Sequence, residues 1–208
     1  ADVWGKDQAY SFRQAIGAYF VAMETVAGAV VNAITDAVID LHPDLDRPLS
    51  TLRGASGSSI LTCLGYKHGA RHNRARPLVA PHTDVGVITL LHFDGDGGSC
   101  AVLQRAHGGT WVNVSLPKDL TADPVFVVNA ADIFSDLTGG IVRSTLHRVM
   151  PVRPPAVKKG KERYCLAFFV GLNPDAELEL PATGEKLTYE MWRRGRIKRA
   201  QDTLKENN

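Results

Sequence analysis

The sequence predicts a mainly β fold with a helix at each end, and three observations carry this prediction. Apolar residues recur at three- and four-residue steps over residues 8–42, which is the pattern of a long amphipathic helix. Short apolar runs separated by turn residues then fill residues 59–181. A second helical pattern covers residues 188–205. The 208 residues can bury a full core, and we expect one domain.

The first helix is expected to end near His42, because Pro43 cannot continue it. Its apolar stripe predicts a scaffold that packs one face on a sheet. The runs after it are too short for helices and suit an antiparallel sandwich or small barrel. The predicted strands are Ser59–Leu64, Val85–Leu91, Ala101–Leu103, Trp111–Val114, Val125–Asn129 and Tyr164–Leu172.

Composition excludes several classes of protein. The three cysteines are an odd number without CxxC spacing, so neither a disulfide framework nor a zinc ribbon is expected, and a reducing, cytoplasmic location is the default. No basic-then-apolar leader is visible and no uninterrupted apolar stretch reaches about 18 residues, so no membrane partner is expected. The net charge of +2 is uninformative about nucleic acid, and the basic run 193–199 lacks interleaved aromatic residues, so no nucleic-acid partner is expected. The oligomeric state stays open.

The motif His-x-Asp occurs three times, and local context separates the copies. His42-Pro43-Asp44 lies at a helix exit, and His92-Phe93-Asp94 runs into a glycine-rich turn. His82-Thr83-Asp84 instead opens the apolar run that follows it. Residues two apart in a strand project from the same face, so the spacing predicts that His82 and Asp84 reach one ion. His92 is about 26 Å further along such a strand, at roughly 3.3 Å per residue, and cannot join them.

A third ligand would have to come from a distant segment. Thr145, His147 and Val149 share one face of a short predicted strand that leaves the turn at 138–140. A single histidine on such a strand is more often structural. Together with His82 and Asp84, however, it would complete the two-histidine, one-carboxylate ligand set of the non-haem Fe(II) oxygenases.

The segments around these residues resemble a known family in order along the chain. The matching segments are 82–91 (HTDVGVITLL), 111–114 (WVNV), 127–132 (VVNAAD), 143–149 (RSTLHRV) and 163–169 (RYCLAFF). Together they resemble the isopenicillin N synthase-like branch of the Fe(II)/2-oxoglutarate-dependent dioxygenases over roughly residues 61–181. The resemblance implies a double-stranded β-helix, or jelly roll, behind the long scaffold helix. It also implies that the family's usual N-terminal segment is absent from this chain.

The resemblance assigns His82, Asp84 and His147 as the ligands of Fe(II) and as the catalytic centre. Three ligands on one face of an octahedron would leave positions for 2-oxoglutarate and dioxygen. The reaction implied is hydroxylation or desaturation of a small organic substrate, with release of succinate and carbon dioxide.

Three further residues are implied in binding 2-oxoglutarate. Arg163 matches the family arginine that pairs with the C5 carboxylate, and a guanidinium suits that task through its bidentate fork. Cys165 stands where the family usually has a serine, and its thiol is a weaker donor than a hydroxyl. Tyr66 matches the tyrosine of the family's Asn-x-Tyr pair, whose asparagine is replaced here by Leu64.

Two alternatives remain at the level of the sequence. One is an iron oxidase or cyclase that does not use 2-oxoglutarate, which the replacement of serine by Cys165 would favour. The other is a catalytically silent jelly-roll binding module that has kept its metal strands. The coincidence of three ligands with Arg163 favours the 2-oxoglutarate enzyme.

Overall fold

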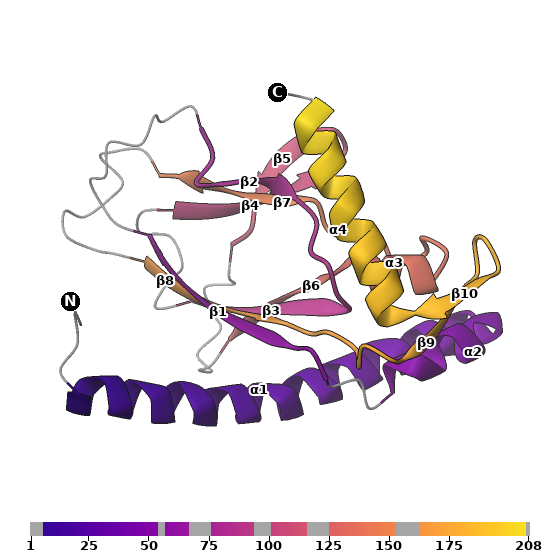
Figure 1. The fold of residues 1–208 in the computed structure, drawn as a ribbon. Helices are drawn as coiled ribbons and strands as arrows, with labels where there is room; N and C mark the ends of the chain where they lie inside the picture. The colour runs from indigo at the N-terminus through magenta and orange to yellow at the C-terminus, as the bar shows by residue number, and fades with distance from the viewer. Residues whose placement is uncertain are drawn as a thin grey trace.

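Two four-stranded antiparallel sheets face each other in the computed structural model, and the long helix α1 lies under one of them (Figure 1). The structure describes residues 6–53, 57–66, 76–93, 101–115, 125–152 and 163–206. The strand order is β1-β8-β3-β6 in the sheet next to α1 and β2-β7-β4-β5 in the other sheet. This arrangement is a double-stranded β-helix, so the predicted fold class is confirmed.

The elements are as follows. The helices are α1 (Lys6–Leu41), α2 (Asp46–Leu49), α3 (Asp132–Leu137) and α4 (Tyr189–Glu206), with 3-10 turns at Pro43–Leu45 and Ser50–Leu52. The strands are β1 (Ile60–Tyr66), β2 (Val79–His82), β3 (Ile88–Phe93), β4 (Ala101–His107), β5 (Thr110–Asn113), β6 (Phe126–Ala130), β7 (His147–Pro151), β8 (Arg163–Phe169), β9 (Glu177–Leu180) and β10 (Glu185–Thr188). β9 and β10 form a separate two-stranded hairpin.

The scaffold helix α1 buries one stripe against the sheet. Met23, Ala27, Val31 and Val38 are buried at steps of four, four and seven residues, as an amphipathic helix requires. They belong to one apolar cluster with residues of the adjacent sheet face, such as Phe168. The edge-on contact of the Phe20 and Phe168 rings, with centroids 5.2 Å apart, fixes this packing.

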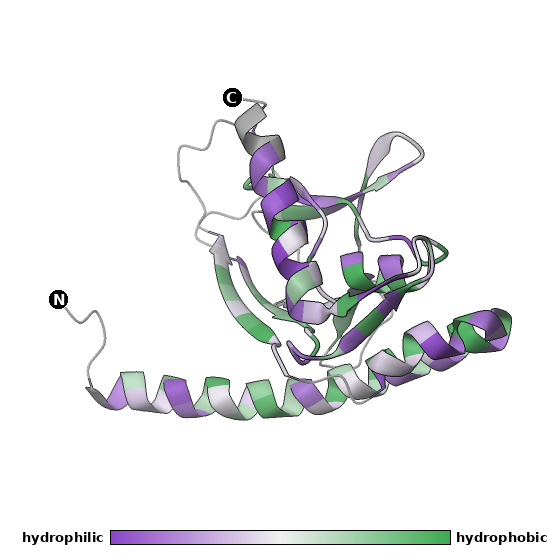
Figure 2. Cartoon of the chain, turned by 45° about the vertical axis from the view of Figure 1, so that its right-hand side comes forward, coloured by the Kyte–Doolittle hydropathy of each residue, from purple (hydrophilic) through white to green (hydrophobic). Residues whose placement is uncertain are grey.

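The N-terminal end of α1 is less covered by the sheets. Figure 2 shows its first turns extending past the edge of the sheets, and Tyr10 and Phe12 are exposed there. By length and composition α1 could also cross a membrane, and 17% of its apolar window is buried. The core helix of a soluble protein passes the same test. The expectation of no membrane partner therefore stays a prediction.

A second apolar cluster fills the space between the two sheets. It contains Leu91, Ala101, Leu103, Val149, Cys165 and Ala167. Alternation along β3 divides its side chains between the two clusters: Ile88 and Leu90 belong to the α1 side, whereas Leu91 belongs to the inner side. Inner-face residues near the strand ends are therefore available to build a site between the sheets.

One predicted strand starts later than expected. The run Val85–Leu91 was predicted to be continuous with His82, but β2 ends at His82 and β3 begins only at Ile88. The five residues between them form a turn in which Gly86 has a φ of +148°. The Val170 carbonyl, which accepts the Val87 N–H at 2.9 Å, lies against this glycine. A Cβ at Gly86 would lie 2.7 Å from that oxygen, so the close approach requires glycine.

We predict that Gly86→Ala lowers the free energy of unfolding by about 1–3 kcal/mol, because it adds a clash with fixed backbone to an unfavourable φ. Denaturant unfolding of the purified protein measures the effect. Gly28→Ala is the matched control, since that glycine is helical and a Cβ there would meet nothing within 4 Å. It should leave stability unchanged or raise it by up to about 1 kcal/mol. Equal stability of both variants would contradict the account.

Candidate metal centre

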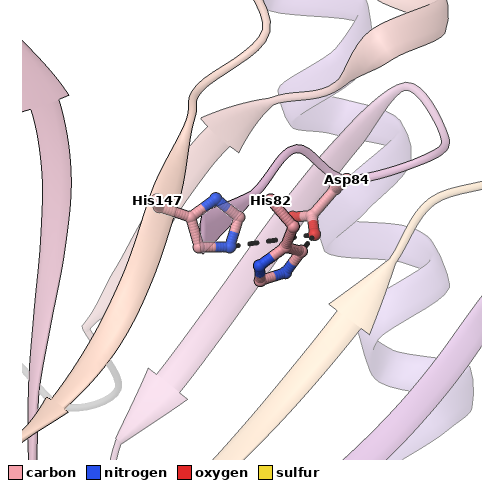
Figure 3. A group of neighbouring side chains, drawn as sticks. All are labelled: His82, Asp84 and His147. Carbon is pink, nitrogen blue, oxygen red and sulfur yellow. Dashed lines mark ion pairs between the residues drawn. The ribbon is translucent and has the colours of Figure 1, made fainter. Parts of the chain in front are cut away.

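The antiparallel pairing of β2 with β7 places two distant histidines side by side. His82 is the register partner of His147, and Val79 is the partner of Val149. Directly opposed residues share one face of a sheet, with Cβ atoms about 4.5–5.5 Å apart. The two imidazole centroids are 4.3 Å apart, and both rings turn toward Asp84 (Figure 3). The predicted convergence of these three side chains is confirmed.

Asp84 reaches the histidines from the turn and not from a strand. The first turn of α3 holds this turn through three backbone bonds: the N–H groups of Asp132, Ile133 and Ala131 donate to the carbonyls of Asp84, Gly86 and Val87 at 2.9, 3.0 and 3.0 Å. Strand alternation is therefore not the reason that His82 and Asp84 meet, although they do meet as predicted. The start of a helix, not a strand ladder, holds the backbone of Asp84.

The two imidazoles present equivalent nitrogens to a common point. Nδ1 of His82 lies 2.9 Å from the Ala80 carbonyl, and Nδ1 of His147 lies 2.8 Å from the Thr145 carbonyl. A carbonyl only accepts, so each Nδ1 carries a hydrogen, and in the neutral imidazole each Nε2 keeps a lone pair for a metal. Backbone carbonyls commonly fix a metal-binding histidine in this tautomer.

The two oxygens of the Asp84 carboxylate have different partners. Its Oδ2 accepts hydrogen bonds from Thr89 Oγ1 at 2.6 Å and from Asn129 Nδ2 at 2.9 Å. Its Oδ1 faces the Nε2 atoms of His82 and His147, at 3.4 and 3.8 Å. No role at the centre was predicted for Asn129. Thr89 was not predicted as a site residue. The signal that could have found it was its place on the inward-facing side of β3.

These contacts also set the pKa values of Asp84 and His82. Burial alone would raise the pKa of Asp84, but hydrogen bonds from His82, Thr89 and Asn129 outweigh burial and lower it to about 2. The hydrogen bond to Asp84 raises the pKa of His82 above its usual 6.5, against the opposing effect of burial. Asp84 is therefore an anion at any physiological pH.

The donor set fits a divalent transition metal. One potential ligand atom from each of the three residues lies within 4.8 Å of the others, and within the described ranges no other group of three such residues is found. Two imidazoles and one carboxylate form the facial triad of non-haem Fe(II) proteins. The side chains of Asp84 and His147 are 4% and 11% exposed, whereas that of His82 is 41% exposed. The protein thus covers one side of the centre.

The C-terminal helix supports the same turn. Arg196 on α4 donates through Nε to Asp132 Oδ2 at 2.5 Å and through Nη2 to Thr83 Oγ1 at 3.0 Å. Thr83 also donates to Asp132, at 3.3 Å. Two arginines of the basic run 193–199 differ in this respect: Arg194 is 77% exposed, whereas Arg196 is 27% exposed and ties α4 to the turn that carries Asp84.

The three residues predicted to hold 2-oxoglutarate gather on the inner face of the sheet next to α1. Arg163 and Cys165 are buried, with Tyr164 between them exposed, as the predicted alternation requires. The Arg163 guanidinium lies 4.3 Å from the Phe93 ring centroid and 5.7 Å from that of Tyr66. Its Nη1 donates to the Ala101 carbonyl at 2.5 Å. Phe93 was not predicted, and it holds the guanidinium plane in place.

The other His-x-Asp copies play no part in this centre. His42 follows α1 and precedes a 3-10 turn, as expected. His92 faces α1, where its Nδ1 lies 3.3 Å from the Tyr19 hydroxyl. Asp94 and Cys100 lie outside the described residues.

Comparison with known proteins agrees with this geometry. Residues 28–172 match the family model of the 2OG-Fe(II) oxygenase superfamily. The chain belongs to that superfamily. The cofactors that define it are Fe(II) and 2-oxoglutarate, and the triad described above supplies the matching ligand set.

Curated relatives are similar over part of their length. The chain is 28% identical over 184 residues to clavatol oxidase of Penicillium crustosum, covering 86% of this chain and 49% of the relative. It is 33% identical over 125 residues to homoarginine-6-hydroxylase of Arabidopsis thaliana, covering 58% of this chain and 33% of the relative. The chain therefore spans half or less of these proteins.

Solved structures show the same fold. A full-length Neurospora crassa protein, in complex with alpha-KG and 5-formyluracil, aligns with a TM-score of 0.70 at 21% identity, over 90% of this chain and 60% of the other. JOX2, in complex with 2OG, Fe and JA, aligns with a TM-score of 0.62 at 22% identity, over 87% of this chain and 51% of JOX2.

We predict that Thr89→Val weakens metal binding by about 10–100-fold, the usual effect of removing a group that orients a metal ligand. Valine keeps the shape of threonine but loses the 2.6 Å bond that orients the Asp84 carboxylate. Anaerobic Co(II) titration followed by absorbance measures the change. Thr110→Val is the control, because its hydroxyl bonds only the His107 carbonyl at an exposed hairpin. A folded Thr89→Val protein with wild-type affinity would remove this support from the account.

Metal affinity should fall as the pH falls. The metal needs neutral His82, whose pKa is raised, so below that pKa each binding event displaces at least one proton and affinity drops at least about tenfold per pH unit. Asp84, with a pKa of about 2, stays ionised and adds nothing to this slope above pH 4. Co(II) titrations from pH 8 to pH 5, with circular dichroism to verify folding, test this. A constant affinity across that range contradicts it.

Proposed function

We propose that this chain is an Fe(II)- and 2-oxoglutarate-dependent dioxygenase that hydroxylates or desaturates a small organic molecule. The observation that carries the proposal is the facial triad: Nε2 of His82, Nε2 of His147 and Oδ1 of Asp84 converge, while the other donor atoms of these residues are held by the protein. A metal bound there would have its remaining positions free for exogenous ligands.

Arg163 supports the use of 2-oxoglutarate. This residue is 2% exposed, its guanidinium is held by Phe93, and it lies on the inner sheet face. A permanently charged planar fork, fixed before the ligand arrives, suits a carboxylate. Cys165 on the same face contributes a weak donor, and Tyr66 forms one wall beside the guanidinium. We assign these three residues to the far carboxylate of the cosubstrate.

Each part of the chain has a defined task in this reaction. When bound, Fe(II) and 2-oxoglutarate would activate dioxygen and oxidise a C–H bond, with succinate and carbon dioxide as co-products. His82, Asp84 and His147 hold the metal, and Thr89 and Asn129 keep the carboxylate oriented. Arg163 orients the cosubstrate, and the apolar inner cluster around Cys165 excludes water.

We further place the chain in the isopenicillin N synthase-like branch of the superfamily, on the order of its motifs from His82 to Arg163. We also propose a reducing, cytoplasmic location, since Cys63 and Cys165 are both thiols rather than members of a disulfide. Fractionation of the source cells would test the location.

Anaerobic addition of 2-oxoglutarate to the Fe(II)-loaded protein tests the function. We expect a weak visible charge-transfer band and, after oxygen is admitted with ascorbate present, slow release of succinate without a prime substrate. His147→Ala should lose metal binding, the band and succinate release. His107→Ala, which removes an exposed histidine at the end of β4, should keep all three.

Other outcomes decide between the alternatives. Fe(II) binding without the band would favour an iron oxidase or cyclase that does not use 2-oxoglutarate. The lack of Fe(II) binding by the wild-type protein would favour the silent binding module.

A further inference from the structure

A cavity of about 320 Å³ opens beside the metal centre, between the outer strands of the two sheets. β5 is the last strand of one sheet and β6 the last of the other, so no further strand among the described residues closes the space between them. His147 and Asn129 line the cavity, and they are respectively a triad member and a support of Asp84. A molecule held in this cavity therefore lies next to the metal ligands.

The sheet register brings Arg105 to the same place. Arg105 on β4 is the partner of His147 on β7, and the neighbouring pair is Leu103 with Val149. Leu103 and Val149 both belong to the inner cluster, and alternation puts residues two positions further on the same face. Ala106 N–H donates to the Leu146 carbonyl at 2.9 Å, so Arg105 and His147 form the non-hydrogen-bonded pair, whose side chains approach more closely.

Arg105 differs from the other arginines near the sheets. Arg148 lies on the outer face, where it donates to Gln104 and covers the Trp111 ring. Arg105 instead lines the cavity and forms no ion pair with any residue of the described ranges. The described residues that line the cavity include no aspartate or glutamate. No carboxylate among the described lining residues therefore compensates the positive charge of Arg105.

The other charges of the centre balance without Arg105. On the proposed function, the two positive charges of Fe(II) and the one of Arg163 are matched by Asp84 and by the two carboxylates of 2-oxoglutarate. The exposed Arg105 therefore has no anionic partner among these groups and is open to an anion that the substrate brings.

We propose that Arg105 selects a substrate that carries a carboxylate. This inference rests on the proposed function and names the chemical class of its substrate. The guanidinium fork of Arg105 binds the carboxylate, while an apolar body packs on Leu103, Val114 and Val127. The anionic group then lies on the β4–β5 side, and the apolar body projects toward the triad.

Arg105 and Arg163 act on different carboxylates. Arg163 on β8 donates to the carbonyl of Ala101, the first residue of β4. Arg105 is four residues after Ala101 on β4, which is about 13 Å at 3.3 Å per residue. One binds the cosubstrate at the inner end of the site, and the other binds the prime substrate at the open edge. Saturation with 2-oxoglutarate therefore leaves Arg105 available.

Equilibrium dialysis of the anaerobic protein, loaded with Fe(II) and saturating 2-oxoglutarate, tests the proposal. The probes are phenylacetate and 4-methylpentanoate, each compared with its primary amide. We expect each acid to bind about tenfold or more tightly than its amide, as a charge-assisted hydrogen bond requires. Arg105→Gln should abolish this preference by weakening only the acids. Arg47→Gln, which neutralises an arginine that is 74% exposed on α2, should preserve it.

The outcomes separate this inference from the proposed function. Equal affinity of the wild-type protein for acid and amide, or a preference that survives Arg105→Gln, overturns the carboxylate assignment. The charge-transfer band, recorded on the same samples, should be unchanged in Arg105→Gln. A band without an acid preference means that the anion site alone is wrong. An Arg105-dependent preference without a band means that the proposed cosubstrate alone is wrong.

Discussion

The metal centre depends on one structural constraint, the antiparallel pairing of β2 with β7. His82 and His147 are 65 positions apart in the sequence, yet the register makes them direct partners. The pairing sets their separation, and the backbone carbonyls two residues before each histidine set their tautomers. A register shift by one residue would turn one imidazole to the other face of the sheet and remove it from the site.

The carboxylate of Asp84 is positioned by other contacts. Asp84 lies in a turn rather than in the strand, and the start of α3 holds the carbonyls of that turn. Thr89 and Asn129, from two strands of the opposite sheet, take up Oδ2 and leave Oδ1 facing the histidines. Both sheets and α3 therefore meet at one carboxylate. α4 adds a brace from outside through Arg196, so even the C-terminal helix belongs to the support of the site.

The helical front and the β-rich body could be predicted because their signals are local, whereas the jelly roll and the complete triad were predicted through the family resemblance. Helical periodicity identified α1, and the motif around His82 identified the ligand pair. The remaining parts depend on contacts between distant segments, which periodicity does not encode. Alternation could not reveal that Asp84 lies in a turn, that Asn129 bonds it, or that Arg196 reaches Thr83. In the sequence, Arg105 likewise does not differ from an ordinary strand residue. Only the register of β4 with β7 places it opposite His147.

The most direct test of the central claim is a crystal structure of the protein grown anaerobically with Fe(II), with the iron located by its anomalous scattering. The account predicts one peak within about 2.0–2.2 Å of Nε2 of His82, Nε2 of His147 and Oδ1 of Asp84, the usual range for such ligands on a divalent transition metal. It also predicts that Oδ2 keeps its bonds to Thr89 and Asn129. A peak bound to His82 and Asp84 but lacking the imidazole of His147 would contradict it.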